Sequence, residues 1–73
     1  MQELVKSLRD DTALLLSRAK AITDHSRKVA REARGRYCKA YQRQLSDNAM
    51  NLNRVSVDLA AVISKLDAIN DEG

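Results

Sequence analysis

Few side chains in this sequence have the type and spacing that catalysis or metal binding requires. Cys38 is the only cysteine and His25 the only histidine, whereas a structural zinc site needs about four ligands. Asp10 and Asp11 are adjacent, so on a helix they point about 100° apart and do not form an acid–base pair. There is no Gly-rich phosphate loop and no nucleophile–histidine–acid set. We therefore expect no catalytic site, metal site, cofactor or small-molecule substrate.

The lone cysteine and histidine have simpler structural interpretations. Cys38 has two functional interpretations, a redox switch and an intermolecular bridge, but a single cysteine in such a chain is more often a small, buried or half-buried hydrophobic residue. His25 has no second histidine or cysteine four residues away. We expect it to be a surface or turn residue.

A basic segment is the strongest local feature of the sequence. Residues 27–43 include seven basic residues and one acidic residue, Glu32, which gives a local net charge of +6. Residues 1–26 are neutral and residues 44–73 carry a net charge of −3. Tyr37 and Tyr41 lie among the basic residues, and guanidinium groups with aromatic rings can bind phosphates and stack on bases. The candidate contacts with a nucleic acid or an acidic partner are Arg27, Lys28, Arg31, Arg34, Arg36, Tyr37, Lys39, Tyr41 and Arg43.

Other interpretations of the basic segment carry more weight. It can be a solvated face that pairs with the acidic residues of 44–73, in an antiparallel fold or an antiparallel dimer. Tyr37 and Tyr41 are four residues apart, on the same stripe as Ala33 and Leu45, which is typical of the edge of a core. Binding to a membrane surface is disfavoured, because the stripe opposite the charges lacks bulky apolar residues.

The composition predicts an all-α protein. The 73 residues include no Pro, Trp or Phe, and Gly occurs only at 35 and 73. Ala, Leu, Arg, Lys and Gln, which favour helices, are abundant. Charged residues make up 32% and apolar residues 44% of the chain, as expected of helices with one buried face.

Apolar residues recur with alternating spacings of four and three, which predicts two coiled-coil-like seams. The first seam is Met1, Val5, Leu8, Thr12, Leu15, Ala19, Ile22, Ser26, Val29 and Ala33. The second seam is Tyr41, Leu45, Asn48, Leu52, Val55, Leu59, Val62, Leu66 and Ile69. Asn48 can fix the register of a seam or belong to a turn. The two seams are out of register, which indicates a stutter or a turn between them.

The sequence offers three positions for a turn between helices, at Gly35, at 23–26 and at 46–48. Asp24, Lys28, Glu32 and Arg36 form a ladder of opposite charges that supports a helix through Gly35. Residues 23–26 and 46–48 are poor helix formers, so we expect a single domain over 1–73 with helices at about 2–22, 26–45 and 48–70. The predicted fold is a small antiparallel bundle of two or three helices. The alternatives are one break near 46–48, an unbroken rod, and long helices in an intermolecular coiled coil.

The chain is too short to bury both seams by itself. A domain of this size buries only about 60% of its unfolded surface, and it contains no cysteine pair that could form a disulfide. We therefore expect a non-enzymatic protein–protein interaction module, such as a small adaptor, regulator or assembly subunit, that forms a homo-oligomer or docks on a larger protein. The alternative is a nucleic-acid-binding protein. The predicted interface residues are Val5, Leu8, Leu15, Ile22, Leu52, Val55, Leu59, Val62, Leu66 and Ile69.

The sequence also bears on location. No apolar run approaches the roughly 18 residues of a membrane span, and Glu3 and Lys6 interrupt the start that a signal peptide would need. A single cysteine favours a reducing compartment. We expect a soluble, intracellular protein, most simply cytoplasmic, that is not bound to a membrane.

Overall fold

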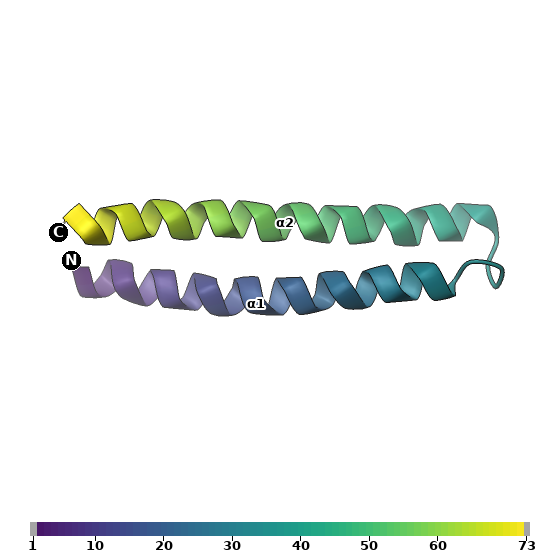
Figure 1. Ribbon diagram of the computed structural model, residues 1–73, viewed down its shortest axis with the longest axis horizontal. Helices are drawn as coiled ribbons and strands as arrows, with labels where there is room; N and C mark the ends of the chain where they lie inside the picture. Colours follow the sequence, from purple (N-terminus) through teal and green to yellow (C-terminus); the bar gives the residue numbers. More distant parts are fainter. Residues whose placement is uncertain (1, 73) are drawn as a thin grey trace.

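Two long helices pack side by side in opposite directions and form a hairpin (Figure 1). This computed structural model describes residues 2–72, so Met1 of the first predicted seam lies outside it. Helix α1 spans Gln2–Glu32 and helix α2 spans Lys39–Glu72. The molecule is 54 × 14 × 12 Å, and its two chain ends lie together, away from the turn. The predicted all-α antiparallel arrangement is confirmed, in its two-helix form.

The turn is at Gly35, which we had expected inside a helix. Gly35 has a φ of +82°, a left-handed conformation that L-residues adopt only at a cost and that glycine, which has no Cβ, adopts freely. The amides of Arg36 and Tyr37 both donate to the carbonyl of Ala33, at 3.0 and 3.2 Å. The chain thereby reverses over residues 33–38. An unbroken rod is therefore wrong, as is a helix through Gly35.

The breaks expected at 23–26 and 46–48 are also wrong, and with them the helices 2–22, 26–45 and 48–70. Both stretches lie inside a continuous helix. Thr23 is buried, and its hydroxyl donates to the carbonyl of Ala19 at 2.7 Å, so its polar group is satisfied within its own helix. Each poor helix former costs only a few tenths of a kcal/mol, and packing along the full length of both helices outweighs that.

The most deeply buried residues of the contact between the two helices all have small side chains. They are Thr12, Ala19, Thr23, Ala33, Ala49 and Ser56. The hydroxyls of Thr12 and Ser56 donate to carbonyls four residues earlier, at 2.8 and 3.3 Å. Within residues 2–72, no large side chain is completely buried. Small residues let helices approach closely, but they bury little apolar area, so the hairpin has a thin core.

Two polar contacts connect the helices away from this seam. Near the open end, Arg9 Nε donates to Asp67 Oδ1 at 2.9 Å. Closer to the turn, Arg27 donates to the amide oxygen of Asn53 at 3.1 Å. These contacts define the register of the hairpin. They show which residues of α1 and α2 lie at about the same level along it.

Candidate interaction surfaces

One side of the hairpin carries a row of large apolar side chains on each helix. In α1 the row repeats every seven residues, and in α2 it repeats every seven residues with Asn48 in one position. All of these residues are exposed, for example Leu8 and Leu15 at 54% and Ile22 at 52%. We call this surface the apolar face. It consists of Leu8, Leu15, Ile22, Val29, Tyr41, Val55, Val62 and Ile69.

The two rows lie next to each other across the hairpin. Ile22 and Val29 of α1 line the same shallow hollow as Leu45 and Asn48 of α2. In an antiparallel helix pair, residues that flank the contact on one side of one helix meet their counterparts on the same side of the other. The apolar face therefore spans both helices from the turn to the open end.

Alternate positions of the predicted seams lie in the actual helix–helix contact, and the positions between them do not. Thr12, Ala19 and Ala33 of the first seam are buried. Leu8, Leu15, Ile22 and Val29 are exposed, and the other inward row of α1 contains Arg9, Leu16, Thr23 and Ala30 instead. In both helices the exposed seam residues lie on the same side of the molecule. The apolar stripe of each helix therefore points between its partner helix and solvent, as it does in bundles with more than two helices.

The ten predicted interface residues divide into two groups. Val5, Leu52, Leu59 and Leu66 are half-buried on the inward side of the hairpin. The exposed group is Leu8, Leu15, Ile22, Val55, Val62 and Ile69. The structure thus assigns the first group to the contact within the chain and leaves the second group on the apolar face.

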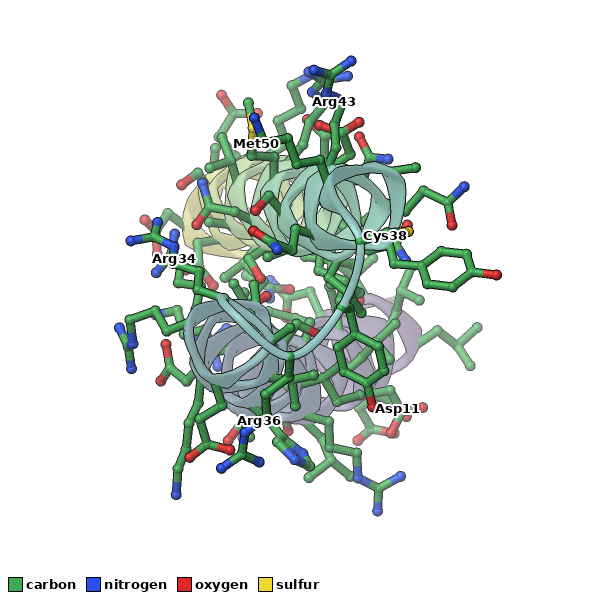
Figure 2. All side chains as sticks on the ribbon, turned by 90° about the vertical axis from the view of Figure 1, so that its right-hand side faces the viewer. Asp11, Arg34, Arg36, Cys38, Arg43 and Met50 are labelled. Atoms are coloured by element: carbon green, nitrogen blue, oxygen red, sulfur yellow. The ribbon has the colours of Figure 1, made fainter. Side chains whose placement is uncertain are left out.

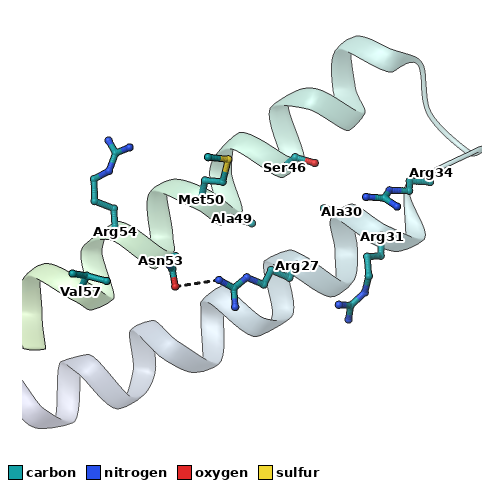
Figure 3. Close-up of a pocket in the computed structure, with 10 residues that line it drawn as sticks. All are labelled: Arg27, Ala30, Arg31, Arg34, Ser46, Ala49, Met50, Asn53, Arg54 and Val57. Atoms are coloured by element: carbon teal, nitrogen blue, oxygen red, sulfur yellow. Dashed lines mark hydrogen bonds between the residues drawn. The ribbon is translucent and has the colours of Figure 1, made fainter.

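The opposite side of the hairpin carries a groove lined by arginines near the turn (Figure 3). Its volume is about 540 Å³, and its lining includes Arg27, Arg31 and Arg34 of α1 and Arg54 of α2. We call these four side chains and the space between them the arginine groove. None of the lining residues in the described part of the chain is acidic. The groove is thus positively charged, although Arg27 lies 3.9 Å from Asp24.

The arginine groove and the apolar face lie on different sides of the molecule. Seen from the turn, Arg34 points to one side of the hairpin and Asp11 to the other (Figure 2). The tyrosines belong to the second side, because Tyr37 and Tyr41 line a hollow together with Val29 and Asn48. The arginines that line the groove are therefore separated in space from the two tyrosines, and these arginines do not form an interleaved surface with tyrosine rings for base stacking.

The remaining basic residues and the tyrosines are all at the surface. Lys28, Arg36, Lys39 and Arg43 are exposed and do not line the arginine groove. Tyr37 and Tyr41 are 56% and 57% exposed, so their expected place at the edge of the core is wrong. This is because the hairpin contact is displaced from their stripe.

Two further expectations concern single residues. Cys38, expected to be buried or half-buried, is exposed in the turn, because the turn falls where we had expected a helix. His25 is exposed on α1, as predicted. Within residues 2–72, no three metal-ligating side chains gather into a cluster.

Sequence reasoning missed Arg54 as part of the basic surface. Arg54 lies 11 positions after the basic segment ends at Arg43. It joins Arg27 and Arg31 only because the chain reverses at Gly35. A correct turn position would have revealed it, since Asn53 then faces Arg27.

Within residues 2–72, the ion pair of the basic segment is Arg27 with Asp24 of its own helix, not a pair with an acidic residue of 44–73. Residues 27–43 surround the turn, whereas three of the five acidic residues of 44–73, Asp67, Asp71 and Glu72, lie in the last turns of α2 at the open end. Along a molecule 54 Å long, these groups are several Debye lengths apart at about 0.1 M salt. The hairpin is therefore basic at the turn and acidic near its ends.

Neither helix, as described over residues 2–72, has the length and apolar character that crossing a bilayer requires. Comparison of the chain with protein-family models, curated proteins and solved structures found no match.

Proposed function

We propose that this chain is a non-enzymatic helical interaction module that binds protein through its apolar face. The proposal rests on one observation: eight large apolar side chains are about half exposed on one side of the hairpin, while the residues that the helix contact buries most deeply are alanine, threonine and serine. Exposed apolar patches on monomeric proteins rarely exceed about 300–600 Å², and larger ones mark interaction sites. A small adaptor, regulator or assembly subunit would carry such a surface.

The size of the apolar face supports this proposal. Its eight residues are on average about half exposed. With a full area of about 170 Å² for a residue of this size, the face presents roughly 700 Å². A specific protein interface buries about 800 Å² on each partner. The apolar face is thus large enough to form most of one.

The sequence provides a matched pair of positions for a test. Leu14 and Leu15 are adjacent, have the same side chain and are 56% and 54% exposed, but only Leu15 belongs to the apolar face. A photo-crosslinking residue, p-benzoylphenylalanine, would replace one or the other in a tagged chain expressed in cells. We expect covalent capture of a polypeptide from position 15 and little from position 14. Equal capture, or none from position 15, would refute the proposed function.

A second candidate function is binding to nucleic acid through the arginine groove. Four arginines from two helices line one groove, and none of its lining residues in the described part of the chain is a carboxylate. Phosphate groups of a nucleic-acid backbone suit such a site, because arginine binds phosphate oxygens with two donors at once. Since the tyrosines lie on the other side of the molecule, we expect phosphate contacts without base stacking.

A salt series would test this second candidate. Four phosphate contacts predict a log–log slope of about −3.6 on duplex DNA. The double variant Arg31→Gln/Arg54→Gln should reduce the slope by about 2, and Arg43→Gln, which lies outside the groove, serves as the control. Absence of binding at low salt, or an equal effect of the control, would exclude the groove as the site.

We also propose an intracellular location. The only cysteine, Cys38, is exposed, and free exposed thiols persist in reducing compartments such as the cytoplasm.

A further inference from the structure

The geometry points to a second copy of this chain as the occupant of the apolar face. In the arrangement that we propose, two hairpins pack face to face into a four-helix bundle, with both turns at the same end. This inference rests on the proposed function and specifies its partner. It follows from the exposed seam residues, the exposed area and the charges beside the apolar face.

The exposed seam residues favour a four-helix bundle over a single added helix. Both α1 and α2 turn their apolar stripe toward the same side, along their whole length. One helix lying on this face would cover the groove between α1 and α2 and leave the outer edges exposed. A second hairpin offers two rows of its own, so each row of one copy meets a row of the other. A two-fold axis makes such a surface complementary to itself.

The exposed area is also of the size that a second copy needs. Roughly 700 Å² on each copy is close to the 800 Å² per partner of a standard interface. The charged residues beside the apolar face would add to this area. The thin core of the single hairpin gives the chain a physical reason to associate, since chains of this size usually need a partner or a crosslink to remain folded.

Charged side chains flank the apolar face on both helices. Asp11 and Arg18 follow Leu8 and Leu15 by three residues, so they lie at the outer edge of the face on α1. By the same spacing, Asp58 and Lys65 follow Val55 and Val62 on α2. Each of the four charged side chains is exposed. Their pairing depends on how the second copy is oriented.

The register of the hairpin decides which of these charges meet. Arg9 is level with Asp67, to which it donates, so Asp11 is level with Lys65, two residues before Asp67. Arg27 is level with Asn53, to which it donates. Midway between these two contacts, Arg18 is level with Ala60, so Asp58 lies two positions, or about 3 Å, from the level of Arg18, within reach of a long arginine side chain.

A two-fold axis parallel to the helices places α1 beside α2 of the other copy at the same level. Asp11 then faces Lys65 of the second copy, and Arg18 faces its Asp58, each twice by symmetry. With the turns at opposite ends, α1 would instead lie beside α1, and α2 beside α2. Near the centre of that interface, Arg18 would face a second Arg18, and Asp58 a second Asp58. The flanking charges therefore favour turns at the same end.

The arginine grooves do not prevent this orientation. The arginine groove is on the side of the hairpin away from the apolar face, so the two grooves would lie on opposite outer surfaces of the bundle. Charges separated by more than about 10 Å are largely screened at 0.1 M salt. The opposite charges beside the apolar face would be in contact and are screened less.

The single native cysteine provides a direct test. Cys38 is exposed in the turn, so a nitroxide spin label there reports where the two turns lie. We expect sedimentation equilibrium to give twice the chain mass, and pulsed electron paramagnetic resonance to give a label separation below half the 54 Å length of the hairpin. A separation near the full length would overturn the arrangement. A folded monomer at high micromolar concentration would overturn the second copy as the partner.

Two sets of variants make the result specific. Leu15→Asp should weaken self-association at least tenfold, and Leu14→Asp should leave it within about twofold of the parent. Arg18→Asp and Asp58→Arg should each weaken it several-fold, and their combination should restore it. Failure of the double variant to restore association would refute the same-end pairing.

The crosslinking experiment separates this inference from the proposed function. Capture from position 15 of a species with the mass of two chains supports both. Capture of a different protein alone would overturn the second copy as the partner and leave the proposed function standing.

Discussion

The conformation of Gly35 can be tested through the handedness of a single added methyl group. At a φ of +82°, a Cβ placed on Gly35 meets no atom within 4 Å. The effect of a substitution therefore comes from the backbone alone. An L-residue in the left-handed region costs about 1–2 kcal/mol, and a D-residue is relaxed there.

The expected changes in the free energy of unfolding have opposite signs. For Gly35→Ala, the backbone cost is partly offset by about 0.4–1 kcal/mol, because alanine restricts the unfolded chain. The net loss is about 1 kcal/mol, or a decrease in Tm of about 4–8 °C for a chain of this length. With D-alanine at the same position only the gain remains, and Tm should rise by about 2–8 °C.

The measurement is thermal and urea unfolding followed by circular dichroism at 222 nm. Chemical synthesis supplies the D-alanine chain, and the synthetic glycine chain serves as the reference. All samples need the same concentration, because association shifts the apparent stability. If the helix instead continued through Gly35, L-alanine would stabilise it by about 1 kcal/mol and D-alanine would destabilise it. That reversal of sign would refute the hairpin.

Two further substitutions test the helix contact. Ala19→Leu places a large side chain in the helix contact, where Ala19 is buried, and should lower the free energy of unfolding by about 1–3 kcal/mol. The control Ala21→Leu, at an exposed position, should change it by less than about 0.5 kcal/mol. An equal effect of the two substitutions would contradict the helix contact. Asp67→Asn removes the half-exposed ion pair with Arg9, and the free energy of unfolding should fall by at most about 1 kcal/mol, with no difference from the parent at 1 M salt. The control Asp71→Asn, at an exposed position, should leave the free energy of unfolding unchanged. A decrease that persists at high salt would show that the ion pair is not its cause.

The helical periodicity was predictable from the sequence, but the direction in which each apolar stripe points in the hairpin was not. The four–three spacing of Leu8, Leu15 and Ile22 correctly indicates a long apolar stripe. It does not show whether the neighbouring helix covers that stripe or only approaches one edge of it. In the hairpin, Ala19 of the predicted seam is buried, and the next buried position is Thr23 rather than Ile22 of the seam. The small side chain of Thr23 allows close packing, and no periodicity rule favours it over Ile22.

The turn was mispredicted because two weak effects of similar size compete at Gly35. Each pair in the ladder of opposite charges contributes about 0.2–0.5 kcal/mol, and glycine inside a helix costs about 1 kcal/mol. In the structure Asp24 lies 3.9 Å from Arg27 of α1, and the helix ends at Glu32 before the ladder is complete. The place of Arg54 in the arginine groove depends on this turn, so it was out of reach of the sequence pattern.

The short connection between the helices has a consequence for how the hairpin closes. Arg27 and Asn53 are separated by 26 positions along the chain, whereas Arg9 and Asp67 are separated by 58. Joining the more distant pair directly from the unfolded chain costs about 0.7 kcal/mol more loop entropy. Helix pairing should therefore begin beside residues 33–38 and advance toward the chain ends. Opening should start at the chain ends, so backbone amides there should exchange with solvent deuterium faster than those beside the turn.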